Sequence, residues 1–263
     1  MRRENVFFRK LICLLMIPAF LSCSVVTQFS KEKLPRKSYL FVKKILSLEK
    51  CVKEGCKTNT YTSVGSGFVI KKTSLGSFAL TAAHVCEDGV KETKEIKVSG
   101  QIKVQTLDGR YYRADILSQN REIDVCLLFV EDLVEGVEEV TIADDAPREG
   151  DKAINIASPF GIHYNNVVPI FEGRYVGKVG FRDFYTIPAA PGSSGSMILN
   201  EDGKLIGLLH SVFIGMNQIV VSVNYAALKQ FIKKNMIHYY PERKRTLQEE
   251  TFLNYQKLSV SSK

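Results

Sequence analysis

Short apolar runs separated by turn residues fill most of the chain after residue 38. They cover residues 39–45, 67–70, 78–80, 96–98, 102–107, 125–130, 153–156, 167–171, 184–187, 197–199, 205–212 and 218–223. This density of short runs, with few helical periods between them, predicts an all-β sandwich or barrel. Turn signals agree, because Asp108-Gly109 follows one run and residues 200–203 join two others as a predicted hairpin.

One later segment carries a helical period. Its apolar residues recur at spacings of three and four, and lysines occupy the other side: Tyr225, Leu228, Phe231 and Ile232 against Lys229, Lys233 and Lys234. The pattern predicts an amphipathic helix that starts near Asn224. Residues 236–263 then read as a polar and basic tail, in which 247–258 could form a second, partly amphipathic helix.

The N-terminus has the order of charges and apolar residues that is typical of an export signal. Four cations (Arg2, Arg3, Arg9 and Lys10) precede the apolar run 11–21, which is shorter than the ~20 residues of a membrane span. The run ends in Phe20-Leu21-Ser22-Cys23, which resembles a bacterial lipobox except at Phe20. We therefore predict a signal over 1–23, lipidation of Cys23, a polar tether over 24–37, and a membrane-anchored protein in the cell envelope or periplasm.

Composition and charge narrow the choice of function. Among 263 residues, 45% are hydrophobic and 24% charged, which excludes wholesale disorder. The formal charge of +8 lies partly at the two ends, so we expect no nucleic-acid partner. The four histidines are dispersed and form no close set with cysteine, so we expect no metal and no cofactor.

Six cysteines fit an oxidising compartment. Cys13 would leave with the signal and Cys23 would carry lipid, which leaves four that can pair in three ways: Cys51, Cys56, Cys86 and Cys126. A bridge between the first two could close a tight hairpin. The last two could be a pair or two buried free thiols.

The sharpest chemical signal is Pro191-Gly192-Ser193-Ser194-Gly195-Ser196. Serine flanked by glycine allows a tight turn whose amides (Gly192, Ser193, Ser194) point into one small volume, where they could stabilise an oxyanion. A nucleophilic serine also needs a base and a carboxylate to orient that base. His84 lies at an apolar strand end, and Asp124 precedes the apolar run 125–130. Taken singly, each could be an ordinary structural residue; together they suggest a catalytic set.

Three segments resemble the trypsin/chymotrypsin-type serine peptidases: Thr81-Ala-Ala-His84, Ile123-Asp124-Val125-Cys126 and Gly192-Ser193-Ser194-Gly195. Gly65-Ser66-Gly67, Pro159-Phe160-Gly161 and Asp202-Gly203 add a resemblance to the bacterial Deg/HtrA-like branch. The resemblance implies a domain over 38–235 with two six-stranded antiparallel β-barrels, about 38–140 and 141–235, and the site between them. It also implies that His84 is the base, Asp124 orients it, Ser194 is the nucleophile, and the amides of Gly192 and Ser194 form the oxyanion hole.

The chain departs from that pattern at two positions. Ser196 replaces a usual glycine, and His210 stands where the family has a small hydroxyl residue. His210 could line the first specificity pocket with Ala189, Ala190 and Ser211, could bond to Asp124 in competition with His84, or could face outward. Residues 187–191 carry no acid, so we expect a small or medium apolar residue, not Lys or Arg, before the cleaved bond. After residue 235 we expect no PDZ domain of ordinary size.

These observations predict an exported serine endopeptidase that acts on proteins or peptides. The main alternative is a catalytically silent member of the fold that serves as a binding or scaffold lipoprotein. A basic nucleic-acid-binding protein and a metal hydrolase are weaker alternatives. The sequence leaves the oligomeric state open.

Overall fold

A computed structural model describes residues 34–52, 55–90, 92–93, 96–213 and 215–237. The predicted signal with Cys23, most of the predicted tether, and the predicted tail with its second helix, apart from residues 236 and 237, lie outside the described residues. Among the helices of the described ranges, none is long and apolar enough to cross a membrane.

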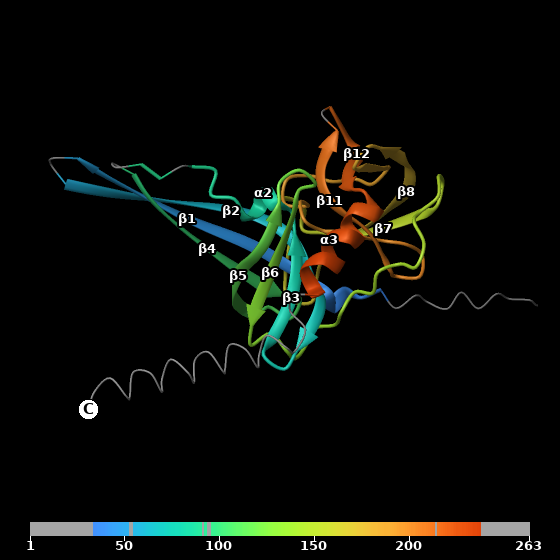
Figure 1. Ribbon diagram of the computed structural model, residues 1–263, viewed down its shortest axis with the longest axis horizontal. Helices are drawn as coiled ribbons and strands as arrows, with labels where there is room; N and C mark the ends of the chain where they lie inside the picture. Colours follow the sequence, from blue (N-terminus) through green and yellow to red (C-terminus); the bar gives the residue numbers. More distant parts are fainter. Residues whose placement is uncertain (1–33, 53–54, 91, 94–95, 214, 238–263) are drawn as a thin grey trace, which may run out of the picture. The chain divides into compact units, whose positions relative to one another are not determined.

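The described chain forms two closed barrels of six antiparallel strands each, as the resemblance implied. The strand order is β1-β2-β3-β6-β5-β4 in the first barrel and β10-β11-β12-β9-β8-β7 in the second (Figure 1). The first barrel consists of β1 (Tyr39–Val52), β2 (Gly55–Thr73), β3 (Gly76–Thr81), β4 (Ile96–Thr106), β5 (Tyr111–Asn120) and β6 (Val125–Glu131). The second consists of β7 (Lys152–Ile156), β8 (Ile170–Val179), β9 (Arg182–Tyr185), β10 (Met197–Leu199), β11 (Leu205–Phe213) and β12 (Met216–Val223). The all-β fold class is confirmed.

The strands next to His84 and Asp124 in the sequence are largely buried. All six residues of β3 are buried, and so are the first four of β6, which pairs with β3 along its whole length. The apolar runs 78–80 and 125–130 account for this burial. The end of β3, just before His84, therefore lies beside the start of β6, just after Asp124.

The first barrel extends into a ribbon that the apolar pattern did not predict. β1 runs to Val52, beyond the apolar run that ends at residue 45, and Cys51 pairs with Cys56 near the β1–β2 turn. β4 accompanies β1 as far as Lys50, and Figure 1 shows β1, β2 and β4 running outward together. Residues 55–63 of β2 are exposed. An exposed ribbon needs no apolar face, so its sequence carries no alternation to detect.

Strand β5 was also absent from the prediction. Of its ten residues only Ala114 is buried, so no apolar run marks it. The runs 96–98 and 102–107 belong to one strand, β4, and the run 167–171 enters β8 only at Ile170. In each case the ladder of backbone hydrogen bonds sets the strand's length, and side-chain burial varies along it.

The predicted C-terminal helix is confirmed as α3 (Tyr225–Ile237). Tyr225, Leu228, Phe231 and Ile232 are all buried, whereas the three lysines are exposed. The other described helical segments are short: η1 (Arg36–Ser38), α2 (Ala83–Cys86) and η2 (Pro159–Gly161).

Candidate active site

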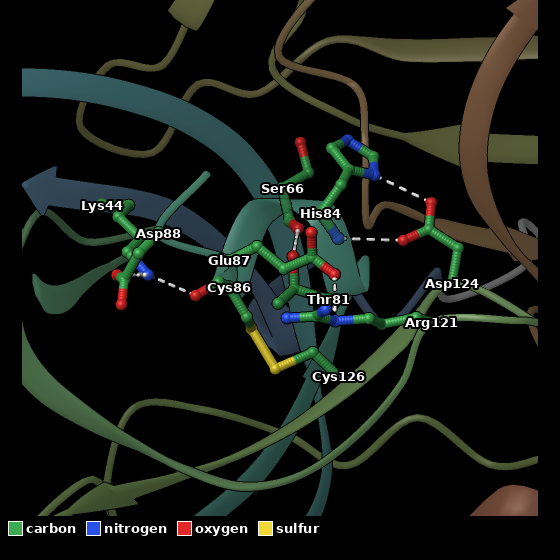
Figure 2. Close-up of a disulfide and its surroundings, with 10 residues drawn as sticks. All are labelled: Lys44, Ser66, Thr81, His84, Cys86, Glu87, Asp88, Arg121, Asp124 and Cys126. Carbon is green, nitrogen blue, oxygen red and sulfur yellow. Dashed lines mark hydrogen bonds and ion pairs between the residues drawn. A yellow bond between two sulfur atoms is a disulfide. The ribbon is translucent and has the colours of Figure 1, made fainter. Parts of the chain in front are cut away.

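His84 and Asp124 meet through two hydrogen bonds. The backbone N–H of His84 donates to Asp124 Oδ1 at 2.9 Å, and its ring Nδ1 lies 2.8 Å from Oδ2 (Figure 2). A carboxylate can only accept, so Nδ1 carries the proton and Nε2 is left with a free lone pair. The ring is therefore held in the tautomer that can take up a proton at Nε2.

Several contacts hold the two segments in place. The Cys86–Cys126 disulfide joins the residues two positions beyond His84 and Asp124, and Arg121 pairs with Glu87 at 2.8 Å (Figure 2). Buried Lys44 on β1 donates to the Cys86 carbonyl. Asp124 itself has a left-handed backbone (φ 57°), an unusual conformation that often occurs at functional sites.

Each of the two partners shifts the pKa of the other. The hydrogen bond with Asp124 raises the pKa of His84 above 6.5, although burial opposes the change. Burial would raise the pKa of Asp124, but the hydrogen bonds from His84 outweigh it and the pKa falls below its usual range. The carboxylate is therefore ionised at neutral pH, and the His84 imidazole is a stronger base than a free histidine.

Ser194 lies in a tight loop before β10. Gly192 and Gly195 adopt positive φ angles of 100° and 85°, where a side chain would be strained. The Gly195 N–H donates to the Leu209 carbonyl at 2.7 Å, and the Ser194 carbonyl accepts from the Ser66 N–H at 2.8 Å. The loop is thus anchored to β11 of the second barrel and to β2 of the first.

The Ser194 hydroxyl is half-buried and lies 3.4 Å from the carbonyl of His210. In the part of the chain that the structure describes, no hydrogen bond joins it to His84. Such nucleophile–base bonds are often long in unliganded enzymes and shorten when a substrate binds. His210 lies between the two segments: its carbonyl is near Ser194 Oγ, and its ring Nδ1 lies 3.8 Å from Asp124 Oδ2.

Two amides of the loop are open. Among the described residues, none accepts a hydrogen bond from the N–H of Gly192 or Ser194. The Ser193 N–H, by contrast, donates to the Ala190 carbonyl at 2.9 Å. Of the three predicted oxyanion residues, the geometry therefore leaves Gly192 and Ser194 as the available donors, and Ser193 shapes the turn.

Ser196 is fully buried, and its hydroxyl accepts a hydrogen bond from Asn155 Nδ2 at 2.8 Å. The side chain that replaces the usual glycine thus has a partner inside the second barrel. The sequence did not identify Asn155, because a polar residue within an apolar run does not show which side chain it will bond to in the fold.

A cleft of about 800 Å³ borders His84, Asp124, His210 and Ser211. Its remaining lining includes apolar and charged residues that sequence reasoning missed: Val179, Phe181, Phe184, Glu87, Arg121 and Arg182. Of the predicted substrate-binding residues, His210 and Ser211 line this cleft. Ala189 is buried, with its N–H donating to the Asn217 carbonyl, and neither it nor Ala190 is part of the lining.

Comparison with known proteins agrees with this geometry. The family model for the trypsin-like peptidase domain matches residues 65–208, more than half of the chain. A probable periplasmic serine endoprotease DegP-like of Chlamydia muridarum is 29% identical over 157 residues, 57% of this chain and 29% of that protein. The periplasmic pH-dependent serine endoprotease DegQ of Escherichia coli is 27% identical over 154 residues, 56% and 31% of the two chains. The aligned part thus spans under a third of these relatives' length. The chain belongs to the trypsin-like peptidase domain family.

Proposed function

We propose that this protein is a serine endopeptidase that hydrolyses protein substrates through an acyl-enzyme. One observation carries the proposal. Both oxygens of Asp124 bind His84, at its backbone N–H and its ring Nδ1, which leaves Nε2 as an acceptor beside an open cleft. The unused amides of Gly192 and Ser194 support it, because they supply donors for the negative charge that acylation creates.

In the first half of the reaction, Ser194 Oγ attacks the substrate carbonyl carbon and its proton passes to His84 Nε2. Negative charge then develops on the carbonyl oxygen, and the N–H groups of Gly192 and Ser194 stabilise it. The ionised Asp124 stabilises the imidazolium that has formed.

In the second half, His84 donates its proton to the leaving amine as the peptide bond breaks and the acyl-enzyme remains. Water then attacks the ester, and His84 takes a proton from it and returns that proton to Ser194 Oγ. The chain's residues and water complete this cycle.

The proposal extends to location and organisation. The relatives' names describe periplasmic proteins, the N-terminus has an export pattern, and the two disulfides suit an oxidising compartment. We propose that Cys23 carries lipid, that residues 24–37 form the tether, and that the peptidase domain spans 38–235 with barrels over about 38–140 and 141–235. Residues 238–263, after the end of α3 at Ile237, form the tail, which was predicted to begin two residues earlier.

Labelling with a fluorophosphonate probe tests the activity. We expect the full chain to react at one site, and mass spectrometry of the peptides should place the adduct on Ser194. The heat-unfolded protein is the control, because a serine without a positioned base is unreactive. A folded protein that takes up no probe and cleaves no unfolded protein would favour the alternative, a silent scaffold lipoprotein.

The His84–Asp124 bond predicts the pH profile. Because Asp124 raises the pKa of His84 above 6.5, and the base must be neutral, kcat/KM should fall as the pH drops through this raised value. We expect an inflection above pH 6.5 in a series from pH 5 to 9. Burial lowers the pKa of His210 and His163, so NMR titration should show those rings deprotonating below 6.5. A flat profile would contradict the assignment of His84 as the base.

A further inference from the structure

Ser66 on β2 lies against the nucleophile loop although it has no assigned role. It is fully buried, and its N–H donates to the Ser194 carbonyl at 2.8 Å. Its own carbonyl accepts from the Thr81 hydroxyl at 2.8 Å, just before His84 (Figure 2). The backbone of Ser66 therefore connects the segments that carry the base and the nucleophile.

The Ser66 hydroxyl has a complete set of hydrogen bonds. It donates to the Gly192 carbonyl at 2.9 Å and accepts from the Ser158 N–H at 3.0 Å. Ser158 Oγ lies 3.1 Å away. A hydroxyl has one proton and two acceptor sites. Since the proton of Ser66 goes to Gly192, Ser158 is the donor in the bond between the two side chains, and Ser66 is locked in one orientation.

The peptides on both sides of Gly192 have their carbonyl groups held by hydrogen bonds. The peptide that follows it has its carbonyl bound by Ser66. The peptide that precedes it has the Pro191 carbonyl bound by the Phe160 N–H at 2.6 Å. In a trans peptide the N–H points opposite to the carbonyl. Fixing the Pro191 carbonyl toward Phe160 therefore turns the Gly192 N–H the other way.

The fit around Gly192 is close. A Cβ at this position would lie 2.5 Å from the Ser158 carbonyl, so the glycine packs directly on the 158–161 segment. Phe160 itself has a left-handed backbone (φ 53°), and its side chain is 75% exposed. Burial of the Phe160 ring therefore does not explain its unusual backbone conformation. The N–H of the same residue donates to the Pro191 carbonyl.

We propose that the buried Ser66 hydroxyl is a positioning residue for the oxyanion hole. By binding the Gly192 carbonyl it fixes the Gly192–Ser193 peptide, while the Phe160 N–H fixes the Pro191–Gly192 peptide, and the two together keep Gly192 in the conformation in which its N–H faces the reacting carbonyl oxygen. This inference rests on the proposed peptidase function. Ser158 supports Ser66 from behind through its N–H and its hydroxyl. Ser66 does not touch the substrate and acts only through Gly192.

Kinetics of Ser66→Ala in the full chain test the inference. Removing an oxyanion donor outright lowers kcat by about 10²- to 10³-fold. Loss of a group that only holds the donor should lower kcat by roughly 10- to 100-fold with KM unchanged, because the donor acts in the transition state. Ser77→Ala is the matched control. Ser77 is also fully buried and its hydroxyl donates to the Leu133 carbonyl, at the end of β3 away from His84.

Hydrogen exchange gives a readout that does not need turnover. The Ser193 and Ser196 amides are bonded within the loop, and their exchange should accelerate in Ser66→Ala but not in Ser77→Ala. If the wild type fails to turn over while this exchange difference is present, the proposed function fails and the positioning of Gly192 stands. The inference would be overturned if Ser66→Ala had the same kinetics and amide exchange as Ser77→Ala, or if it raised KM and left kcat unchanged. Should Ser66→Ala not fold, Ser158→Ala, which removes one of the two Ser158 donors, should give the same pattern with a smaller effect.

Discussion

Replacing Ser194 with alanine should lower kcat roughly 10⁶-fold. The alanine removes the atom that forms the acyl-enzyme, so His84 and Asp124 no longer have a nucleophile to activate. A small rate above that in water should remain, because the amides of Gly192 and Ser194 would still stabilise an oxyanion.

Turnover of an unfolded protein and labelling by the fluorophosphonate probe are the two measurements. Ser47→Ala, a change in the β1 part of the extended ribbon, is the control for a serine remote from the loop. Labelling that persists in Ser194→Ala would place the reactive residue elsewhere. Equal losses in Ser194→Ala and Ser47→Ala would indicate a defect in folding, which the circular dichroism of each variant checks.

Asp124→Asn should lower kcat roughly 10⁴-fold. An amide has only one oxygen to offer, whereas Asp124 uses one oxygen for the His84 N–H and the other for Nδ1. If the amide NH₂ faces the ring, Nδ1 must accept and the proton moves to Nε2, where it blocks uptake of the serine proton. The size of the side chain is unchanged, so the fold should persist.

The measurement is kcat/KM with the melting temperature recorded beside it. Asp144→Asn, which removes a carboxylate that pairs with Lys204 at 2.7 Å on the second barrel, is the control for a lost surface charge. NMR should also show the pKa of His84 dropping in Asp124→Asn, since its main stabilising partner is gone. An Asp124→Asn variant within tenfold of wild type would mean that Asp124 does not orient the base.

The sequence predicted the parts of the fold that are buried. Strands β3 and β6 have unbroken apolar runs, and α3 has a clear period, because their side chains pack in the core. Strand β5 and the outer part of β2 were missed because most of their side chains are exposed or only half-buried, so no apolar run marks them.

The sequence likewise predicted some residues of the candidate site and missed others. His84, Asp124 and Ser194 were identified because three residue types in a specific order are rare by chance. The roles of Ser66 and Asn155 could not be predicted, because each depends on which carbonyl or hydroxyl lies opposite a buried side chain. For His210, three alternatives remained open: lining the pocket, bonding to Asp124, or facing outward. The ring lines the cleft and lies 3.8 Å from Asp124 Oδ2, and with a side chain only 14% exposed it does not face outward.

The Cys86–Cys126 disulfide covalently joins the chain segment that carries His84 to the segment that carries Asp124. Its ends are 40 residues apart, and closing a loop of this length restricts the unfolded chain by about 4 kcal/mol in the chain-entropy description. Thiol oxidation during biogenesis thus becomes a step in maturation of the protein. A newly made chain gains the cross-link between its base and carboxylate segments only after it enters an oxidising environment.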